Sequence, residues 1–180
     1  MSTRTLTLTA VLAAICCLLG PVTLPIGPVP LSLTTGVLMG MALILGARRA
    51  CLCCGVYLML GLLGVPVFSG FTGGLGTLLG PTGGFLLGYL PLTAWCGFAC
   101  ARTTDRRLQA LALIAGTLLL YGIGGAWYAH LTGTSFAAAL AVCMLPFLPG
   151  DALKKAAVII GGSALDAYIN SSIATKAVKL

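Results

Sequence analysis

The sequence Leu-Pro-Phe-Leu-Pro-Gly-Asp-Ala-Leu-Lys-Lys occupies residues 145–155 and places one carboxylate and two ammonium groups between long apolar segments. Pro146 and Pro149 cannot lie inside a continuous helix without removing hydrogen bonds, whereas aspartate is a good N-cap. We therefore expect a helix to begin at about Asp151 and to continue through the apolar residues that follow. On that helix Asp151 and Lys154 share one face.

Two interpretations of this charged pair follow from the residues themselves. A carboxylate and an ammonium group at the mouth of an apolar bundle can bind both ends of a polar small molecule, and the helix N-terminus adds partial positive charge. Alternatively, Asp151 only caps the helix, while Lys154 and Lys155 extend to the lipid headgroups. The segment alone leaves both interpretations open.

The composition of the whole chain indicates an integral membrane protein. Of the 180 residues, 59% are hydrophobic and 7% are charged, and the mean hydropathy is +1.09. So few polar side chains cannot cover a water-soluble globule. The net charge is +7, and the ten lysines and arginines lie singly or in small groups between apolar segments. This spacing argues against a nucleic-acid-binding surface.

The length matches one all-α domain, residues 1–180, with about six membrane-spanning helices. Prolines, glycines and arginines divide the chain, and the helices are expected at about 6–20, 31–45, 50–64, 82–101, 108–130 and 151–173. The glycine-rich segment 65–80 is expected to form a lid with aromatic anchors, and 131–150 an uncharged loop. Small residues four apart, such as Ala10 and Ala14 or Gly84 and Gly88, predict close helix packing.

The basic residues predict the orientation in the membrane. Eight of them fall on one side of this plan: Arg4, Arg48, Arg49, Arg102, Arg106, Arg107, Lys176 and Lys179. The positive-inside rule then places both termini in the cytoplasm and the loops around Val22, Phe71 and Phe136 outside. Only Lys154 and Lys155 lie at the opposite end. Because an ionisable group within the membrane is by default a candidate functional group, this favours the ligand-site interpretation.

The eight cysteines are interpreted as packing residues, and no metal or cofactor is predicted. Cys51, Cys53 and Cys54 lie at the expected cytoplasmic end of the third helix, where thiols stay reduced. No histidine or carboxylate is close to them in the sequence, and the partners that would complete the four ligands of a zinc site cannot be placed.

Catalytic motifs are incomplete, so we do not predict an enzyme. Ser163, in Gly-Gly-Ser-Ala (161–164), resembles the serine of an intramembrane hydrolase. It should lie near the middle of the membrane, whereas His130, the only possible base, belongs to the outer interface. Gly-Pro-Thr-Gly-Gly (80–84) lacks the Lys-Ser/Thr ending of a phosphate-binding loop, so ATP hydrolysis by this chain is not expected.

Four segments, in this order, resemble one family. They are Pro-Ile-Gly-Pro-Val-Pro-Leu-Ser-Leu (25–33), Gly-Val-Pro-Val-Phe-Ser-Gly (64–70), Gly-Gly-Leu-Gly-Thr-Leu-Leu-Gly-Pro-Thr-Gly-Gly-Phe-Leu-Leu-Gly-Tyr (73–89) and Leu-Pro-Gly-Asp-Ala-Leu-Lys (148–154). The combination resembles BioY, the biotin-specific S component of energy-coupling-factor (ECF) vitamin transporters. The resemblance implies a six-helix bundle that binds biotin on its outer face, beneath the loop after the third helix.

The resemblance also implies partners and contact residues. Transport in this family is driven by a separate membrane scaffold and two ATPase subunits, and the spacing of Ala10 and Ala14 is similar to the family's contact with the scaffold. Biotin needs a cation for its valerate carboxylate and hydrogen-bonding groups for its ureido ring, which Lys154 and Asp151 match. The candidate apolar walls and close backbone contacts are Phe68, Phe71, Gly74, Thr82, Gly83, Gly84, Phe85 and Tyr89.

The sequence departs from the family pattern at Phe85, where the family is associated with tyrosine, and no basic residue lies near the lid to act as a second cation. A different class of protein also accommodates the charged pair. In a structural or pore-forming membrane protein, Asp151 and Lys154 would line an aqueous vestibule. Binding of biotin by the purified chain distinguishes the two classes.

Overall fold

The computed structural model describes the backbone of residues 3–24 and 31–177 and the side chains of residues 6–7, 9–23 and 32–162. The side chains of Arg4, Ser163, Lys176 and Lys179, and the start of the segment 25–33, lie outside these limits. In chain order the elements are α1 (Thr3–Leu19), β1 (Thr23–Leu24), β2 (Leu31–Ser32), α2 (Thr34–Leu45), α3 (Ala47–Leu62), α4 (Leu75–Leu79), α5 (Gly83–Cys100), α6 (Arg106–Thr132), α7 (Phe136–Met144), the 3₁₀ turn η1 (Leu145–Phe147) and α8 (Leu148–Ala177).

The predicted helical class is correct, with one small addition. The strands β1 and β2 pair antiparallel, with Thr23 opposite Ser32, and form a ribbon of two residues on each side. Every other described element is helical.

The expected start of the last helix is wrong. α8 begins at Leu148, so Asp151 lies within its first turn and is not its N-cap. Pro149 is tolerated there because the first turn does not use its missing N–H group. The expected loop 131–150 is also wrong, since it contains α7, whose N-cap Ser135 accepts a hydrogen bond from the backbone N–H of Ala138 at 3.3 Å.

The third helix also begins earlier than expected. Gly46 adopts a φ of +74°, which a glycine adopts without strain, and this residue alone separates α2 from α3. Arg48 and Arg49 consequently lie in the first turn of α3 and do not terminate the helix before it. A Cβ on Gly97 would collide with Ala47, so the C-terminal half of α5 lies directly against this turn.

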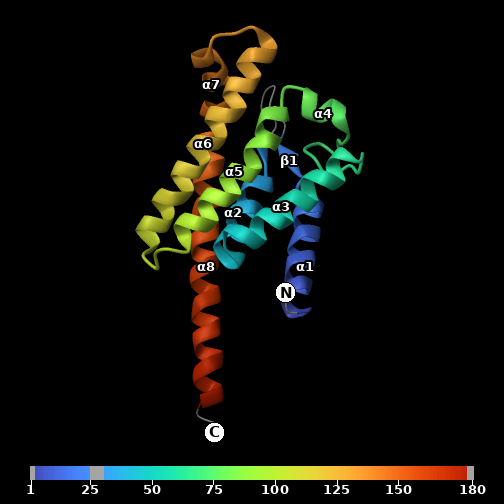
Figure 1. Cartoon of the computed structure of the whole chain (residues 1–180). Helices are drawn as coiled ribbons and strands as arrows, with labels where there is room; N and C mark the ends of the chain where they lie inside the picture. The colour runs from blue at the N-terminus through green and yellow to red at the C-terminus, as the bar shows by residue number, and fades with distance from the viewer. Residues whose placement is uncertain (1–2, 25–30, 178–180) are drawn as a thin grey trace.

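The central element is α5, which packs against α2, α3 and α6 (Figure 1). Glycines permit its close approach to α6: a Cβ on Gly84 would collide with Trp127, and one on Gly88 would lie 2.7 Å from Leu120 Cδ1. The predicted close packing at Gly84 and Gly88 is therefore confirmed. α1 packs against α2 and α3, and α8 packs against α2 and α6.

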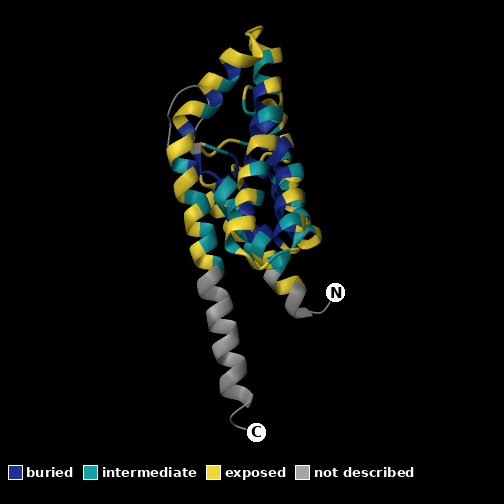
Figure 2. Ribbon diagram, turned by 90° about the vertical axis from the view of Figure 1, so that its left-hand side faces the viewer, coloured by how far each residue is buried: buried dark blue, intermediate teal, exposed yellow. Residues whose placement is uncertain are grey.

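The outward faces of the bundle are apolar. Figure 2 shows exposed residues along the outer sides of the helices, and these include large apolar side chains such as Leu18, Leu63 and Ile160, which are 73%, 77% and 68% exposed. Three segments, 83–100, 106–132 and 136–162, are long and apolar enough to cross a membrane, and shorter apolar helices occupy 9–19 and 34–45. These are the features of a multi-pass membrane protein.

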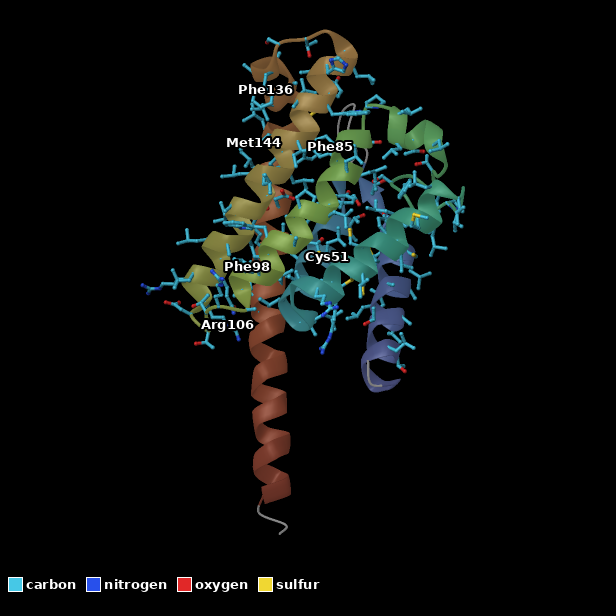
Figure 3. The ribbon with its side chains drawn as sticks, viewed as in Figure 1. Cys51, Phe85, Phe98, Arg106, Phe136 and Met144 are labelled. Atoms are coloured by element: carbon cyan, nitrogen blue, oxygen red, sulfur yellow. The ribbon has the colours of Figure 1, made fainter. Side chains whose placement is uncertain are left out.

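The two ends of the bundle differ in chemistry. The turn between α5 and α6 carries Arg102, whose guanidinium lies 3.8 Å from the centroid of the Phe98 ring. Asp105 caps α6 by accepting a 2.8 Å hydrogen bond from the N–H of Arg107. Arg106 and this turn lie at the end of the bundle where α1 begins, whereas Phe136 lies at the other end with α4 and α7 (Figure 3).

Candidate functional site

A cavity that is partly open to solvent lies between α2, α5, α6 and α8, beneath the segment that precedes α4, and it contains about 580 Å³ of empty space when the part open to solvent is included. Its polar lining consists of Ser32, Thr35, Ser69, Thr77, Thr82, Tyr121, Asp151 and Lys154. Its apolar lining consists of Phe68, Phe85, Leu86, Tyr89, Leu120 and Phe147.

Lys154 points into the bundle. Its Nζ atom donates to the carbonyl oxygen of Ser32 at 2.6 Å, to Oγ1 of Thr35 at 3.2 Å and to Oδ1 of Asp151 at 3.1 Å. Three acceptors match the three hydrogens of an ammonium group. The lysine is thus fixed at the cavity wall between α8 and the start of α2, and it does not extend toward lipid headgroups. The predicted shared face of Asp151 and Lys154 is confirmed.

The stem of this lysine packs over Gly36 of α2. A Cβ on Gly36 would lie 3.5 Å from both Cβ and Cγ of Lys154, so the lysine stem runs across α2 at van der Waals distance. The short α2–α8 separation therefore directs the ammonium group to the first residues of α2.

Asp151 is held by donors on two helices. Asp151 is 4% exposed, and its Oδ2 atom accepts a 2.7 Å hydrogen bond from the hydroxyl group of Tyr121 on α6. Oδ2 also lies 3.9 Å from Nζ of Lys155. A buried carboxylate needs such partners because desolvation penalises its charge. Sequence reasoning missed Tyr121, which is thirty residues away and belongs to no motif.

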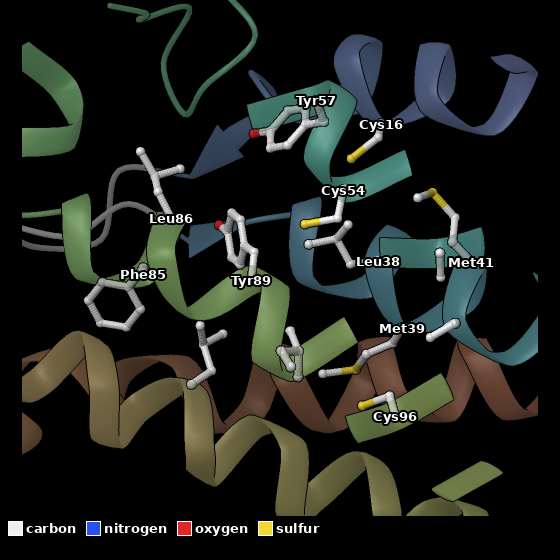
Figure 4. Close-up of a cluster of buried hydrophobic side chains, with 14 of the residues drawn as sticks. Cys16, Leu38, Met39, Met41, Cys54, Tyr57, Phe85, Leu86, Tyr89 and Cys96 are labelled. Atoms are coloured by element: carbon white, nitrogen blue, oxygen red, sulfur yellow. The ribbon is translucent and has the colours of Figure 1, made fainter. Parts of the chain in front are cut away.

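Aromatic rings form the apolar walls. The rings of Phe85 and Tyr121 meet edge to face, with centroids 6.5 Å apart and planes at 82°. Phe68 is 1% exposed and meets Tyr57 in the same manner at 5.6 Å. The ring centroid of Tyr57 in turn lies 6.5 Å from that of Tyr89. Figure 4 shows Tyr57 and Tyr89 between the Phe85 end of α5 and the sulfur-rich core that contains Cys16, Cys54 and Cys96.

The structure brings six of the ten predicted binding residues to one cavity: Phe68, Thr82, Phe85, Tyr89, Asp151 and Lys154. It does not bring the other four there. Phe71 is 71% exposed on the lid, and Gly74 is the N-cap of α4 with a φ of +85°. A Cβ on Gly83 would collide with the carbonyl oxygen of Leu78, and Gly84 packs on Trp127, so both glycines serve close packing.

The segment 65–80, which the sequence predicts to be a lid, contacts the bundle near both of its ends. The Phe68 ring occupies the position that a Cβ on Gly61 of α3 would need. At the other end, Nε1 of Trp127 on α6 donates a 3.0 Å hydrogen bond to the carbonyl oxygen of Gly80. Sequence reasoning identified Phe68 as an anchor but missed Trp127, because the hydrogen bond joins residues 47 positions apart.

On α1, Ala13 is buried against the bundle, whereas Ala10 and Ala14 are exposed on its outer side. The two small residues of the predicted scaffold contact are therefore available on the surface of the isolated chain.

The fold and the site together define a helical membrane protein with a cavity between its helices, which carries a lysine at one wall and aromatic rings around it. The chain matches the model of the BioY family over residues 1–171 and belongs to that family.

Relatives of this chain align with it over most of their length. "Biotin transporter BioY2" of Lactococcus lactis subsp. cremoris (strain MG1363) is 37% identical over 161 residues, which are 89% of this chain and 88% of that protein. "Probable biotin transporter BioY" of Pyrococcus horikoshii is 34% identical over 160 residues, 89% of this chain and 94% of that one. A crystal structure of the S-component for biotin from an ECF-type ABC transporter superposes with a TM-score of 0.85 and 26% identity, covering 93% of this chain and 95% of that chain.

Proposed function

We propose that this chain is a membrane subunit that binds biotin with high affinity and mediates its uptake. Membership of the BioY family and the similarity to a biotin S-component support the choice of ligand. The observation that carries the proposal is the inward position of Lys154, which presents an ammonium group to a cavity with aromatic walls. Biotin combines a carboxylate with an apolar bicyclic body, so the two surfaces are complementary.

In the proposed complex Lys154 pairs with the valerate carboxylate. Its contact with Thr35, at 3.2 Å the longest of its three hydrogen bonds, is the one that we expect the ligand to replace. Asp151 accepts a further hydrogen bond, from a ureido N–H group, through a second lone pair of its carboxylate, since Oδ1 already accepts from Lys154 and Oδ2 from Tyr121. Phe68, Phe85 and Tyr89 enclose the thiophane ring and the chain.

The remaining predicted residues receive supporting roles in this proposal. Thr82 lines the cavity at the start of α5, and its hydroxyl group is proposed to contact the ureido ring. Phe71, Gly74, Gly83 and Gly84 shape the lid and the packing around the cavity and are not proposed to touch biotin. No cofactor takes part.

Isothermal titration in detergent with biotin and biotin amide tests the proposal. Removing one partner of a charge-assisted hydrogen bond costs about 1.5 to 3 kcal/mol, which is roughly ten- to a hundredfold in affinity. Lys154→Ala should weaken biotin by this amount and biotin amide much less, because the amide lacks the carboxylate charge. Asp151→Asn should weaken both ligands. A purified wild-type chain that binds neither ligand would contradict the proposal and favour the pore-forming alternative.

We further propose that α1, α2, α3, α5, α6 and α8 are the six spans and that both termini are cytoplasmic, in the cell membrane. The arginines of the α2–α3 and α5–α6 turns support this orientation, because they lie at the end where α1 begins.

Energy for concentrative uptake is proposed to come from a separate ECF scaffold and two ATPase subunits, with this chain as a non-catalytic component. The similar solved structure is the S-component of an ECF-type ABC transporter, which supports such partners. The exposed pair Ala10 and Ala14 on α1 is the proposed scaffold contact, since small residues let another helix approach closely.

A further inference from the structure

Asp151 faces two lysines that occupy different positions relative to the cavity. Lys154 lines the cavity, and its Nζ atom lies 3.1 Å from Oδ1. Lys155 is absent from the cavity lining, and its Nζ atom lies 3.9 Å from Oδ2, on the other side of the same carboxylate. Both ammonium groups are largely buried, with side chains that are 11% and 15% exposed. The longer separation gives Lys155 a charge contact with Asp151 and no hydrogen bond.

The cluster of Asp151, Lys154 and Lys155 carries one net positive charge. Asp105, the only other carboxylate among the described side chains, belongs to the helix cap sixteen residues before Tyr121, about 24 Å away along α6. Asp166, whose side chain is outside the described part, is fifteen residues beyond Asp151 on α8, about 22 Å along the helix. Asp105 is therefore too distant to balance the second lysine.

We propose that Lys155 determines the charge of the ligand that the cavity accepts, by acting through Asp151 without touching the ligand. Without Lys155, the charges of Lys154 and Asp151 would cancel. An anionic ligand would then be repelled by the carboxylate as well as attracted by the ammonium group. With Lys155 neutralising Asp151, the charge of Lys154 is available to the ligand. Unbalanced charge is costly in a low-dielectric interior, so a cluster with one positive charge favours a ligand with one negative charge.

The inference rests on the proposed function for the identity of the ligand, a monoanionic carboxylic acid. Its distinctive consequence is that a lysine outside the cavity should affect the choice between biotin and its uncharged amide. A lysine that only stabilised the fold would change both affinities together. The relevant quantity is therefore the ratio of the two dissociation constants.

The test compares Lys155→Met, Lys155→Gln and Lys155→Arg by isothermal titration with biotin and biotin amide. The two neutral replacements should weaken biotin about tenfold and leave the amide near its wild-type affinity, whereas Lys155→Arg should keep the wild-type ratio. Retained binding of the amide also shows that a variant is folded. The double variant Asp151→Asn with Lys155→Met again leaves one net positive charge, so its affinity ratio should return toward that of the wild-type chain.

Two results would overturn the inference while leaving the proposed binding of biotin intact. One is an unchanged ratio of the two dissociation constants in Lys155→Met and Lys155→Gln, whether both ligands keep their affinity or lose it equally. The other is a wild-type chain that binds biotin and its amide equally. A wild-type chain that binds neither ligand would contradict the proposed function itself, and the inference with it.

Discussion

The hydroxyl group of Tyr121 on α6 donates a 2.7 Å hydrogen bond to Oδ2 of Asp151 on α8. Both residues are buried, at 6% and 4% exposure, so the bond joins two helices at the level of the cavity without competition from water. The two oxygens of the carboxylate therefore have different donors: Oδ2 accepts from Tyr121, and Oδ1 accepts from Lys154. Tyr121 is therefore a positioning residue for the charged cluster.

Tyr121→Phe should weaken biotin and biotin amide to the same extent. The change removes one hydrogen bond to a charged group, a loss of about 1.5 to 3 kcal/mol, and it releases Asp151, which both ligands are proposed to contact. Titration with the two ligands measures the effect. Tyr128→Phe, on the same helix but outside the cavity lining, is the matched control. A loss confined to biotin would show that Tyr121 acts on the carboxylate and does not position Asp151.

Gly61→Ala should displace Phe68 from the cavity wall, because the added Cβ would occupy the position of the Phe68 ring. Overpacking of this kind typically costs about 1 to 3 kcal/mol. We expect a lower midpoint of thermal unfolding in detergent and weaker binding of biotin. Gly55→Ala on the same helix is the control, since its Cβ would meet nothing within 4 Å. The control should be neutral or stabilising, because alanine favours helix by up to about 1 kcal/mol over glycine. Equal behaviour of the two variants would argue against the role assigned to Phe68.

Thiol labelling of intact cells should modify Thr72→Cys from outside and Thr104→Cys only after the membrane is made permeable. The lid and the arginine-bearing α5–α6 turn lie on opposite sides in the proposed orientation. The unmodified chain provides the background, and its eight cysteines are buried or half-buried in the bundle. Labelling of residue 104 from outside would reverse the orientation and place the cavity on the cytoplasmic side.

Ala14→Trp should reduce recovery of the chain with its scaffold and ATPase partners while leaving its biotin affinity within about twofold of wild type. A bulky ring at a small-residue contact separates helices, but Ala14 is exposed on α1 and does not line the cavity. Ile15→Trp, on a neighbouring face of α1, is the control. Accumulation of biotin against a gradient by the purified chain alone, in sealed vesicles, would contradict the proposed energy source.

Much of the fold was predictable because it depends on local sequence. Composition and long apolar segments indicate a helical membrane protein, and the Arg and Gly-Pro clusters mark most of the turns. The four-residue spacing of Gly84 and Gly88 predicts close helix packing, although not that α6 is the partner, and the three-residue spacing of Asp151 and Lys154 predicts their shared face. Each of these features is a property of one segment and its helical period.

The precise start of α8 and the composition of the site depended on packing. Two prolines and an aspartate are compatible with a helix that begins at either Leu148 or Asp151, and only the observed chain path distinguishes them. Two partners of the charged pair are distant in the sequence: Tyr121 is 30 residues from Asp151, and Ser32 is 122 residues from Lys154. The exposure of Phe71 and the burial of Phe68, three residues earlier, likewise follow from the lid's contact with Gly61. Local patterns identify which residues share a helix face, but contacts between distant segments are determined by how the helices pack against one another.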